Sequence, residues 1–467
     1  MNLKKDQVMQ YQLRIAGKHY KSLKQHLFPG DGKEAVALVL CGRYERNGIS
    51  ILLTHKIELI PHDECNREVD FVNWKTDRII PLLEEAEIKD LGILKIHSHP
   101  TGYSKFSETD DISDKELFES VFGWCNHDGI HSSSVMLPSG EIFGRIFTPN
   151  LDTFPLDKIS IVGDEINIYK NIIHTENEFS LRTRQAFGDY TFDKLNNMKI
   201  GIVGCSGTGS PVIEQLVRLG VGSIVIIDPD TVERKNLNRI LNTTIEDADS
   251  GKFKTNVISD AIKKIGINTE VISYSQNLYD CFEAIEDLIL CDVVFGCVDS
   301  VDGRHLISQL TNFYSIPYFD IGVRLDADGK GGINGINASI NYIQPGCSSL
   351  LSRGLYTPKR LYDESLLRQN PNDFKELEKQ GYVHNANVDR PAVISINMQI
   401  CSMAINEFLN RLHPYKDETP DKYARVMMDY TGGCVINHAE NEFIEDEYSA
   451  KYLGRGDCKP FLRMTEL

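Results

Sequence analysis

The sequence predicts an α/β protein whose second half forms a doubly wound parallel sheet. The chain has 467 residues, which is enough for two or three domains. From residue 199 onward, strand-like apolar runs alternate with helix-like segments, as they do in a parallel sheet. Before residue 150 the order is different, with paired strands first and a helix and a hairpin after them. We therefore expect two domains of different topology.

Composition narrows the classes of function. The formal net charge of −17 argues against nucleic-acid binding, because phosphate contacts need clustered Lys and Arg. No apolar run approaches the ~20 residues that span a bilayer, and the N-terminal residues lack the apolar core of a signal peptide. The 11 cysteines are dispersed without a CxxC pair, which is typical of reduced thiols. We expect a cytoplasmic protein with neither nucleic-acid nor membrane partners.

Residues 1–150 are predicted to form the first domain. The runs AVALVLCG and ISILLTH, within residues 34–60, indicate paired strands. LGILKIHSHP indicates a further buried strand, SDKELFESVFGWC a capped helix, and SSSVMLP with EIFGRIF a hairpin. Residues 151–196 are expected to be a connector with helical pieces.

Two histidines and an aspartate in the first domain have the spacing of a catalytic metal site. His97 and His99 stand two residues apart on a predicted strand, so both side chains point to the same face. Asp110 follows beyond a turn. Three protein ligands with one position open for water are typical of hydrolytic zinc. The alternative is a pair of core or surface histidines beside a polar loop.

Such a zinc site needs a carboxylate that takes the proton of water and returns it to the leaving amine. Glu34, at the head of the first apolar strand, is the candidate, and Glu45 is the nearest alternative downstream. Ser107 is a candidate to stabilise the oxyanion of a tetrahedral intermediate.

Together, EAVALVLCG and HSHPTGYSKFSETD resemble the JAMM (MPN/JAB) metallopeptidase family, whose pattern is an upstream Glu, then HxHP, then SxxD. The resemblance implies a mixed-sheet metalloprotease domain. In it His97, His99 and Asp110 would bind zinc, Glu34 would be the general acid and base, and Ser107 would support the oxyanion. Members of this family cut peptide or isopeptide bonds after the carboxyl terminus of ubiquitin-like proteins, and some bacterial members trim a small carrier protein to expose Gly-Gly.

Residues 197–467 are predicted to form the second domain. MKIGIVGC, SPVIEQLVRLG and SIVIIDPD indicate a strand, a helix and a strand. A helix at 253–266, the strand TEVISYS, a helix near 281–289 and the strand DVVFGCVD follow. IPYFDIGV and INASINYIQPG are further strands, residues 358–390 are polar and irregular, and AVISINMQICSMAINEFLNRL is a long helix.

A glycine-rich loop follows the first strand of this domain and opens a helix. Gly204, Gly207 and Gly209 let the backbone approach phosphates, and the helix N-terminus favours an anion. Ser206 stands where the pattern GxGxxG has its middle glycine. An NAD-dependent dehydrogenase, with Asp228 bonding the ribose, is the competing interpretation.

Charged residues beyond the loop favour activation of a carboxylate by ATP over redox chemistry. They are Asp228, Asn236 and Arg239 in IIDPDTVERKNLNR, Lys254 in GKFK, and Asp299 with Arg304 in CVDSVDGR. Carboxylate activation needs cations that meet the growing phosphate charge and a carboxylate that holds magnesium. The chain has no GxxxxGK[ST] loop, so attack at the γ-phosphate is not expected.

This segment, from about Arg184 to Leu412, resembles the ThiF/MoeB/ubiquitin-activating (adenylyltransferase) family, and RTRQAFGDYTFDKL resembles its RYxRQ motif. The resemblance implies a Rossmann-like fold, ATP and magnesium as cofactors, and a homodimer in which Arg184 reaches the partner's site. It also assigns ligand contacts: Asp228 to the ribose, Asn236, Arg239 and Lys254 to the phosphates, and Asp299 to magnesium.

The cysteines of this domain bear on two further kinds of chemistry, a structural zinc site and a thioester. Many members of the family hold a structural zinc with CxxC pairs, but here SxxS (Ser349 to Ser352) stands in that place, so a second zinc is not expected. Cys347 and Cys434 are candidates for a thioester-forming cysteine. A plain structural cysteine is the alternative at each position, because a thiolate nucleophile needs a polar, partly exposed site.

Both signatures together predict a bifunctional enzyme of the kind found in bacterial ubiquitin-like conjugation operons. One domain would process or deconjugate a ubiquitin-like or sulfur-carrier protein with zinc. The other would adenylate its C-terminal glycine, and a conjugating enzyme is a further expected partner. Two alternatives stay open: adenylation of a peptide or small-molecule carboxylate in sulfur-carrier or natural-product biosynthesis, and a scaffold with one degenerate domain.

Overall fold

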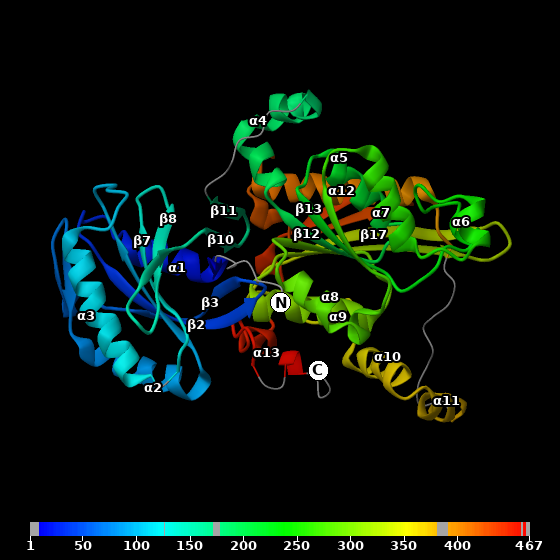
Figure 1. The fold of residues 1–467 in the computed structure, drawn as a ribbon. Helices are drawn as coiled ribbons and strands as arrows, with labels where there is room; N and C mark the ends of the chain where they lie inside the picture. Colours follow the sequence, from blue (N-terminus) through cyan, green and yellow to red (C-terminus); the bar gives the residue numbers. More distant parts are fainter. Residues whose placement is uncertain (1–8, 126, 171–177, 381–390, 459–460, 464–467) are drawn as a thin grey trace, which may run out of the picture. The chain divides into compact units, whose positions relative to one another are not determined.

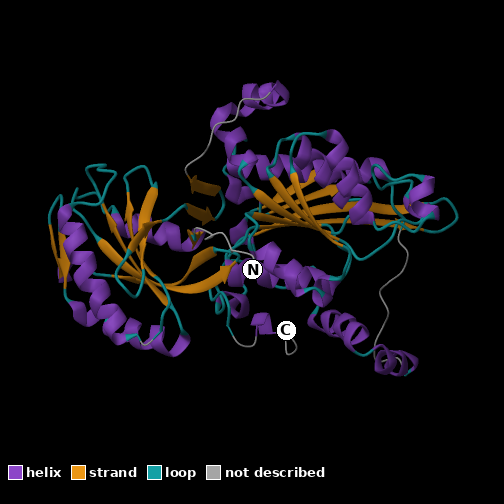
Figure 2. Cartoon of the chain, in the orientation of Figure 1, coloured by secondary structure: helices purple, strands orange, loops and turns teal. Residues whose placement is uncertain are grey.

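The computed structural model describes residues 9–125, 127–170, 178–380, 391–458 and 461–463 (Figures 1 and 2). The chain divides into two compact units. Unit 1 comprises Met1–Asn171, Asn312–Ser315 and Lys451–Leu467, and unit 2 comprises Ile172–Thr311 and Ile316–Ala450. Among the described residues, no helix has both the length and the apolar character needed to cross a membrane.

Unit 1 is built on a nine-stranded mixed sheet with the order β11-β10-β1-β3-β2-β6-β7-β8-β9. Its strands are β1 (Gln10–Ala16), β2 (Val36–Arg46), β3 (Ile49–Leu59), β6 (Gly92–Ser98), β7 (His131–Met136), β8 (Ile142–Phe147), β9 (Thr153–Pro155), β10 (Lys158–Val162) and β11 (Ile166–Lys170). A separate pair is formed by β4 (Cys65–Arg67) and β5 (Val72–Trp74). The helices are α1 (Gly17–Leu27), α2 (Ile80–Lys89) and α3 (Glu108–Trp124).

Both faces of this sheet are covered, which explains why residues 36–42 of β2 and all of β6 are buried. Alternate residues of β2 belong to two different core clusters. Val36 and Leu38 pack with residues of α2 and α3, whereas Ala37 and Val39 pack with residues of α1. Ile93 of β6 belongs to the cluster beneath α3. By strand alternation, positions 95 and 97 of β6 share that face, so the first histidine of the predicted metal site points toward α3.

Residues 153–170 differ from the prediction of a connector with helical pieces. They form β9, β10 and β11, which belong to the sheet of unit 1. β10 pairs in parallel with β1, and Leu13 lies opposite Ile159. KISIV and INIYK are rich in β-branched residues, a strand signal that the prediction overlooked. Only α4 (Leu181–Asn196) is an α-helix among the described residues of this stretch.

Unit 2 is built on an eight-stranded sheet with the order β14-β13-β12-β15-β16-β17-β18-β19. Its strands are β12 (Lys199–Val203), β13 (Ser223–Ile227), β14 (Glu270–Tyr274), β15 (Val293–Gly296), β16 (Tyr318–Ala327), β17 (Ile333–Ile343), β18 (Arg425–Asp429) and β19 (Cys434–His438). Its helices after α4 are α5 (Gly209–Arg218), α6 (Ile245–Asp249), α7 (Lys254–Ile265), α8 (Phe282–Ile289), α9 (Val301–Tyr314), α10 (Pro358–Gln369), α11 (Pro371–Lys379), α12 (Ile394–Leu412) and α13 (Glu447–Ala450).

The predicted doubly wound parallel sheet is confirmed for the first five strands of this order, β14 to β16, which all run parallel. The strands β17 to β19 extend the sheet in antiparallel pairs. Helices α5, α7 and α12 cover one face, and α8 and α9 cover the other (Figure 1). The chain winds from β12 outward to β14 and then returns to β15 on the other side of β12. Ligands bind in such sheets at this switch point, beyond the carboxyl ends of the strands.

The stretch predicted to be irregular, residues 358–390, contains two helices. α10 begins after Thr357, whose side chain accepts a hydrogen bond from the N–H of Arg360, and Pro358 takes the first helical position. A capping Thr followed by Pro is a recognised helix start, which the polar composition of this stretch obscured. Residues 381–390 lie outside the described part of the chain.

The C-terminal segment of the chain belongs to unit 1, although the sequence grouped it with residues 197–467. Its backbone lies against the end of β2: the N–H of Gly42 donates to the carbonyl of Gly454 (3.1 Å), and the N–H of Asp457 donates to the carbonyl of Arg43 (3.1 Å). A Cβ atom at Gly42 would lie 2.2 Å from the carbonyl oxygen of Gly454. The absence of a side chain at position 42 therefore permits this contact.

We predict that Gly42→Ala destabilises unit 1 by about 1–3 kcal/mol, because the new methyl group would overlap backbone atoms that have little freedom to move. Urea unfolding measures the loss, and limited proteolysis tests whether the C-terminal segment is released. Gly123→Ala is the matched control, since a Cβ atom on this α3 residue meets nothing within 4 Å. It should leave stability unchanged or raise it. Equal unfolding midpoints for both variants would contradict the prediction.

Candidate functional site

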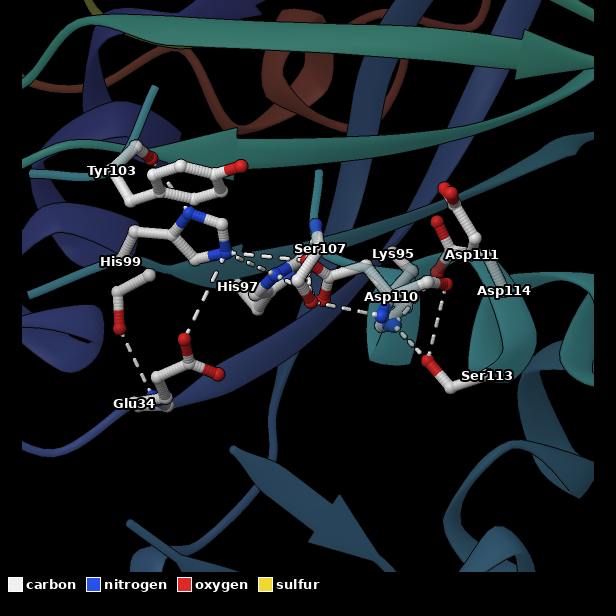
Figure 3. Close-up of polar contacts among 12 residues, drawn as sticks. Glu34, Lys95, His97, His99, Tyr103, Ser107, Asp110, Asp111, Ser113 and Asp114 are labelled. Atoms are coloured by element: carbon white, nitrogen blue, oxygen red, sulfur yellow. Dashed lines mark hydrogen bonds and ion pairs between the residues drawn. The ribbon is translucent and has the colours of Figure 1, made fainter. Parts of the chain in front are cut away.

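The structure brings the three predicted metal ligands of unit 1 together (Figure 3). His97 Nε2 lies 3.1 Å from His99 Nε2 and 3.0 Å from Asp110 Oδ1. His99 Nε2 lies 3.4 Å from Asp110 Oδ2. Ligand atoms about 2.0–2.1 Å from a tetrahedral zinc ion lie roughly 3.3 Å from one another. The donor atoms therefore have the spacing that one such ion requires.

Neighbouring groups orient these donors. His99 Nδ1 lies 2.7 Å from the carbonyl oxygen of Tyr103, which can only accept, so Nδ1 carries the proton and Nε2 offers its lone pair. Ser107 caps α3: its N–H and Oγ both donate to Asp110 Oδ2 at 2.8 Å, and its Oγ accepts from the N–H of Asp110. Ser107 thus orients the carboxylate of Asp110, a role that the sequence did not predict for it.

The predicted acid and base, Glu34, lies at this centre. Glu34 Oε1 is 3.8 Å from His99 Nε2, and its carbonyl oxygen accepts from Arg67 Nε at 2.7 Å. Burial, assisted by the charge of Asp110, raises the pKa of Glu34 to about 7, which suits proton transfer near neutral pH. The alternative, Glu45, pairs with Ser50 near the far end of β2, whereas the start of that strand pairs with His97.

The carboxylate of Asp110 is ionised in this setting. Burial opposes its ionisation, but the close approach of His97 and His99 holds its pKa well below the usual range. Burial lowers the pKa of His97, so this ring is neutral and able to coordinate.

A second group with metal-ligand chemistry, Glu87, Cys125 and His127, also lies in unit 1, with its donor atoms within 4.8 Å of one another. The guanidinium of Arg43 lies 3.5 Å from His127 Nδ1. A fixed cation there opposes a metal cation, so we assign no function to this group.

In unit 2, the glycine loop lies at the switch point of the sheet, between β12 and α5. Gly204 has φ +96°, a left-handed conformation that favours glycine. A Cβ atom at Gly209 would lie 1.8 Å from the carbonyl oxygen of Gly204, and one at Gly207 would lie 2.4 Å from Asn397 Nδ2. All three glycines are therefore required by close backbone or side-chain contacts.

Two of the predicted nucleotide contacts lie together beside this loop. Asp228, at the end of β13, accepts from the N–H of Cys205 at 2.6 Å. Lys254 Nζ lies 3.6 Å from Asp228 Oδ1 and 2.6 Å from Asp230 Oδ2. Burial raises the pKa of Asp228, while Lys254 and the loop N–H counteract this effect. The side chain of Asp228 thus links the glycine loop to the lysine.

The other residues predicted to contact the nucleotide or magnesium are Arg239, Asn236 and Asp299, and each has different neighbours. Arg239 packs its side chain against Gly207, and its Nη1 donates to the carbonyl of Lys235 at 2.9 Å. Asn236 is buried, and its Oδ1 accepts from the N–H of Glu233 at 3.0 Å. Its side chain therefore stabilises the local turn. Asp299 is exposed in the loop between β15 and α9.

Arg184 is held by its own helix. Its Nη2 lies 2.8 Å from the fully buried Asp193, and its Nη1 lies 3.0 Å from Asp189. Gly188, at φ +78°, interrupts α4 between Arg184 and these two aspartates. The predicted contact of Arg184 with a partner's site stays a prediction, and it would require these ion pairs to rearrange.

Sequence reasoning missed two buried polar residues near this site. Asp320 of β16 is fully buried and receives Arg304 Nε (3.1 Å), the hydroxyl of Tyr318 (3.0 Å) and Asn341 Nδ2 (3.2 Å). Asn397 of α12 lies over Gly207. An acidic residue within the apolar run IPYFDIGV was the available signal for Asp320.

The cysteines nearest the glycine loop are buried. Cys401 Sγ donates to the carbonyl of Thr208 at 3.1 Å, and burial raises the pKa of Cys297 to about 12. Such thiols are poor nucleophiles. The predicted candidates lie elsewhere, with Cys347 in the turn after β17 and Cys434 exposed at the start of the edge strand β19.

The SxxS segment makes a hydrogen-bonded turn. Ser349 Oγ donates to Asp446 at 2.5 Å, and the N–H of Ser352 donates to Ser349 Oγ at 3.1 Å. Arg353 Nη2 pairs with Glu440 at 2.7 Å. A hydroxyl hydrogen bond and an ion pair therefore join this turn to Asp446 and Glu440. Ser349 and Ser352 supply no thiolate for a zinc ion.

The parallel strands and the loop define a doubly wound, Rossmann-like α/β unit. The model of the ThiF family matches residues 180–429, more than half of the chain, and the chain belongs to this family. It is 31% identical over 163 residues to "Adenylyltransferase and sulfurtransferase UBA4" of Meyerozyma guilliermondii (34% of this chain, 37% of the relative). It is 30% identical over 169 residues to "Ubiquitin-like modifier-activating enzyme 5" of Dictyostelium discoideum (34% and 42%).

The chain thus spans less than half the length of these curated relatives. Among solved structures, it is similar to E. coli MccB with ATP (TM-score 0.43, 18% identity, 58% of this chain and 74% of that chain). It is also similar to the microcin C7 biosynthetic enzyme MccB in complex with N-formylated MccA (TM-score 0.44, 15% identity, 86% and 97%).

We predict that Gly207→Ala weakens ATP binding at least about tenfold, or about 1.4 kcal/mol, because its Cβ atom would displace Asn397 and press on Arg239. Isothermal titration of ATP into the purified protein measures the effect. Gly335→Ala, on the exposed part of β17, is the matched control, since its Cβ atom would meet nothing closer than 3.8 Å. ATP affinity equal to wild type in the Gly207 variant would show that the loop does not receive the nucleotide.

Proposed function

We propose that unit 2 adenylates the C-terminal carboxylate of a ubiquitin-like or sulfur-carrier protein with ATP and magnesium. The observation that carries this proposal is the glycine loop at the switch point, with Asp228 and Lys254 beside it and Asp299 after the adjacent strand. Membership of the ThiF family and the names of the two curated relatives support it.

In the proposed reaction, a carboxylate oxygen attacks the α-phosphorus of ATP, a new P–O bond forms, and pyrophosphate leaves. The loop N–H groups and the N-terminus of α5 receive the phosphates, because both present positive partial charge. Lys254 and Arg239 balance the charge that develops on the phosphoryl oxygens. Asp228 would bond the ribose, and the exposed carboxylate of Asp299 would hold magnesium, which would supply positive charge to the phosphates.

The buried cysteines around the loop favour release of the adenylate to another acceptor over a thioester on this chain. Adenylation of a peptide or small-molecule carboxylate remains the alternative, and the substrate used in the assay separates the two. The proposal includes a homodimer formed through unit 2 and a conjugating enzyme as a further partner.

We further propose that unit 1 is a zinc-dependent JAMM-type peptidase that trims the same protein or removes it from its targets. The spacing of the donor atoms of His97, His99 and Asp110, with the buried Glu34 beside them, carries this proposal. Bound zinc would lower the pKa of a coordinated water toward about 7. Glu34 would take the proton of the attacking water and deliver it to the leaving amine. Ser107 would hold Asp110 in place through its backbone N–H, while its hydroxyl would turn from Asp110 to the oxyanion.

We expect Asp299→Ala to abolish adenylation while trimming continues, because only the first reaction needs the magnesium carboxylate. ATP–pyrophosphate exchange with a small β-grasp protein ending in Gly-Gly measures this. Glu376→Ala, an exposed carboxylate on α11, is the control and should exchange at the wild-type rate. Exchange that survives in the Asp299 variant would refute the assignment. Exchange with a free peptide, and none with the protein, would favour the alternative substrate.

For unit 1, Asp110→Ala should lose zinc, and Glu34→Gln should retain zinc but lower cleavage by at least about 10²-fold, because only proton transfer is removed. Metal analysis and mass spectrometry of a carrier with an extended tail give both readouts. Glu45→Gln is the control and should cleave normally. Wild-type protein without zinc, or cleavage unchanged in Glu34→Gln, would leave unit 1 as a non-catalytic module.

A further inference from the structure

A buried ion-pair network lies beside the proposed zinc site, on the face of the sheet beneath α3 (Figure 3). Lys95 Nζ lies 2.7 Å from Asp114 Oδ1 and 3.2 Å from Ser113 Oγ. The side chain of Lys95 is 7% exposed and that of Asp114 is fully buried. The pair joins β6 directly to α3.

Arg145 of β8 completes the network from the other side. Its Nη2 lies 2.8 Å from Asp114 Oδ2, and its Nη1 pairs with Asp111. The guanidinium also lies over the ring of Phe106, 3.9 Å from the ring centroid. Arg145 therefore contacts the chain both just before α3 and within its first two turns.

Lys95 and Asp114 each lie close in sequence to a proposed zinc ligand. Lys95 is two residues before His97 on the same strand, and therefore on the same face. Asp114 is four residues after Asp110 on the same helix, about one turn further along. The network thus ties the strand that carries the histidines to the helix that carries the third ligand.

We propose that Asp114, held between Lys95 and Arg145, is a positioning residue that sets Asp110 at the distance from the two histidines that a metal ion needs. This inference rests on the zinc site proposed above. Asp114 acts in two ways. It fixes the start of α3 against β6, and its charge neutralises Lys95, which would otherwise repel a dication bound at the neighbouring His97.

In the contacts of the described residues, nothing in the network touches the donor atoms themselves, so its effect passes through the placement of α3 and through the charge balance at Lys95. The separations of 3.0–3.4 Å between Asp110 and the histidines leave little room for a shift of the helix. Removal of the central carboxylate leaves the buried Lys95 and the half-buried Arg145 without their shared partner, which drives such a shift.

The test uses the full-length protein and its Asp114→Asn variant, with zinc affinity measured by competition with a chelating dye. We expect binding weaker by about 10- to 100-fold, the range found when groups that orient metal ligands are removed. The zinc-dependent rise in the Tm of unit 1 should shrink in the same variant. Glu85→Gln is the matched control, since Glu85 pairs with two lysines at the surface of the same unit. It should bind zinc as the wild type does.

Different outcomes separate the possible failures. A lower Tm in the metal-free variant together with wild-type zinc affinity would overturn the positioning role and leave a purely structural one. A wild-type protein that binds no zinc would overturn the proposed function as well. If Asp114→Asn does not fold, Arg145→Lys keeps the charge but loses the two-pronged contact with Asp111 and Asp114. Weaker zinc binding in that variant supports the proposal, and unchanged binding refutes it.

Discussion

Each unit of this protein depends on a fully buried carboxylate that is paired with arginine beside its candidate site. In unit 1 Asp114 joins Lys95 and Arg145, and in unit 2 Asp320 receives Arg304. A buried charge without its partner costs several kcal/mol, so each pair constrains the elements that carry it. The constraint holds α3 against β6 in one unit and α9 against β16 in the other. Both candidate sites use residues from these elements or from the loops next to them.

Close backbone approach is the second constraint that the two units share. Gly42 admits the C-terminal segment against β2, and Gly207 and Gly209 admit α12 and the carbonyl of Gly204 around the glycine loop. In both places a methyl group would overlap atoms already present. Glycine is therefore needed where two segments of the chain approach too closely to leave room for a side chain.

Regular patterns made the sequence informative. Alternation of strands and helices from residue 199 predicted the parallel sheet, and the loop of Gly204 to Gly209 was located because it follows a strand. His97, His99 and Asp110 were selected by spacing alone, and the fold brings them together. Predictions failed where the local signal was short. Residues 153–170 form strands through pairing with β1, and α10 depends on a Thr-Pro start within a polar stretch.

The sequence by itself determined the types of residue at both sites and the elements that carry them, because period, spacing and glycine placement are local properties. Only the tertiary structure decided which groups meet. Glu34 rather than Glu45 lies at the histidines because β2 pairs with β6 in one register. Ser107 orients Asp110, Arg184 pairs within its own helix, and Asp114 lies between two cations. These relations join segments through packing and hydrogen bonding, which spacing along the chain does not encode.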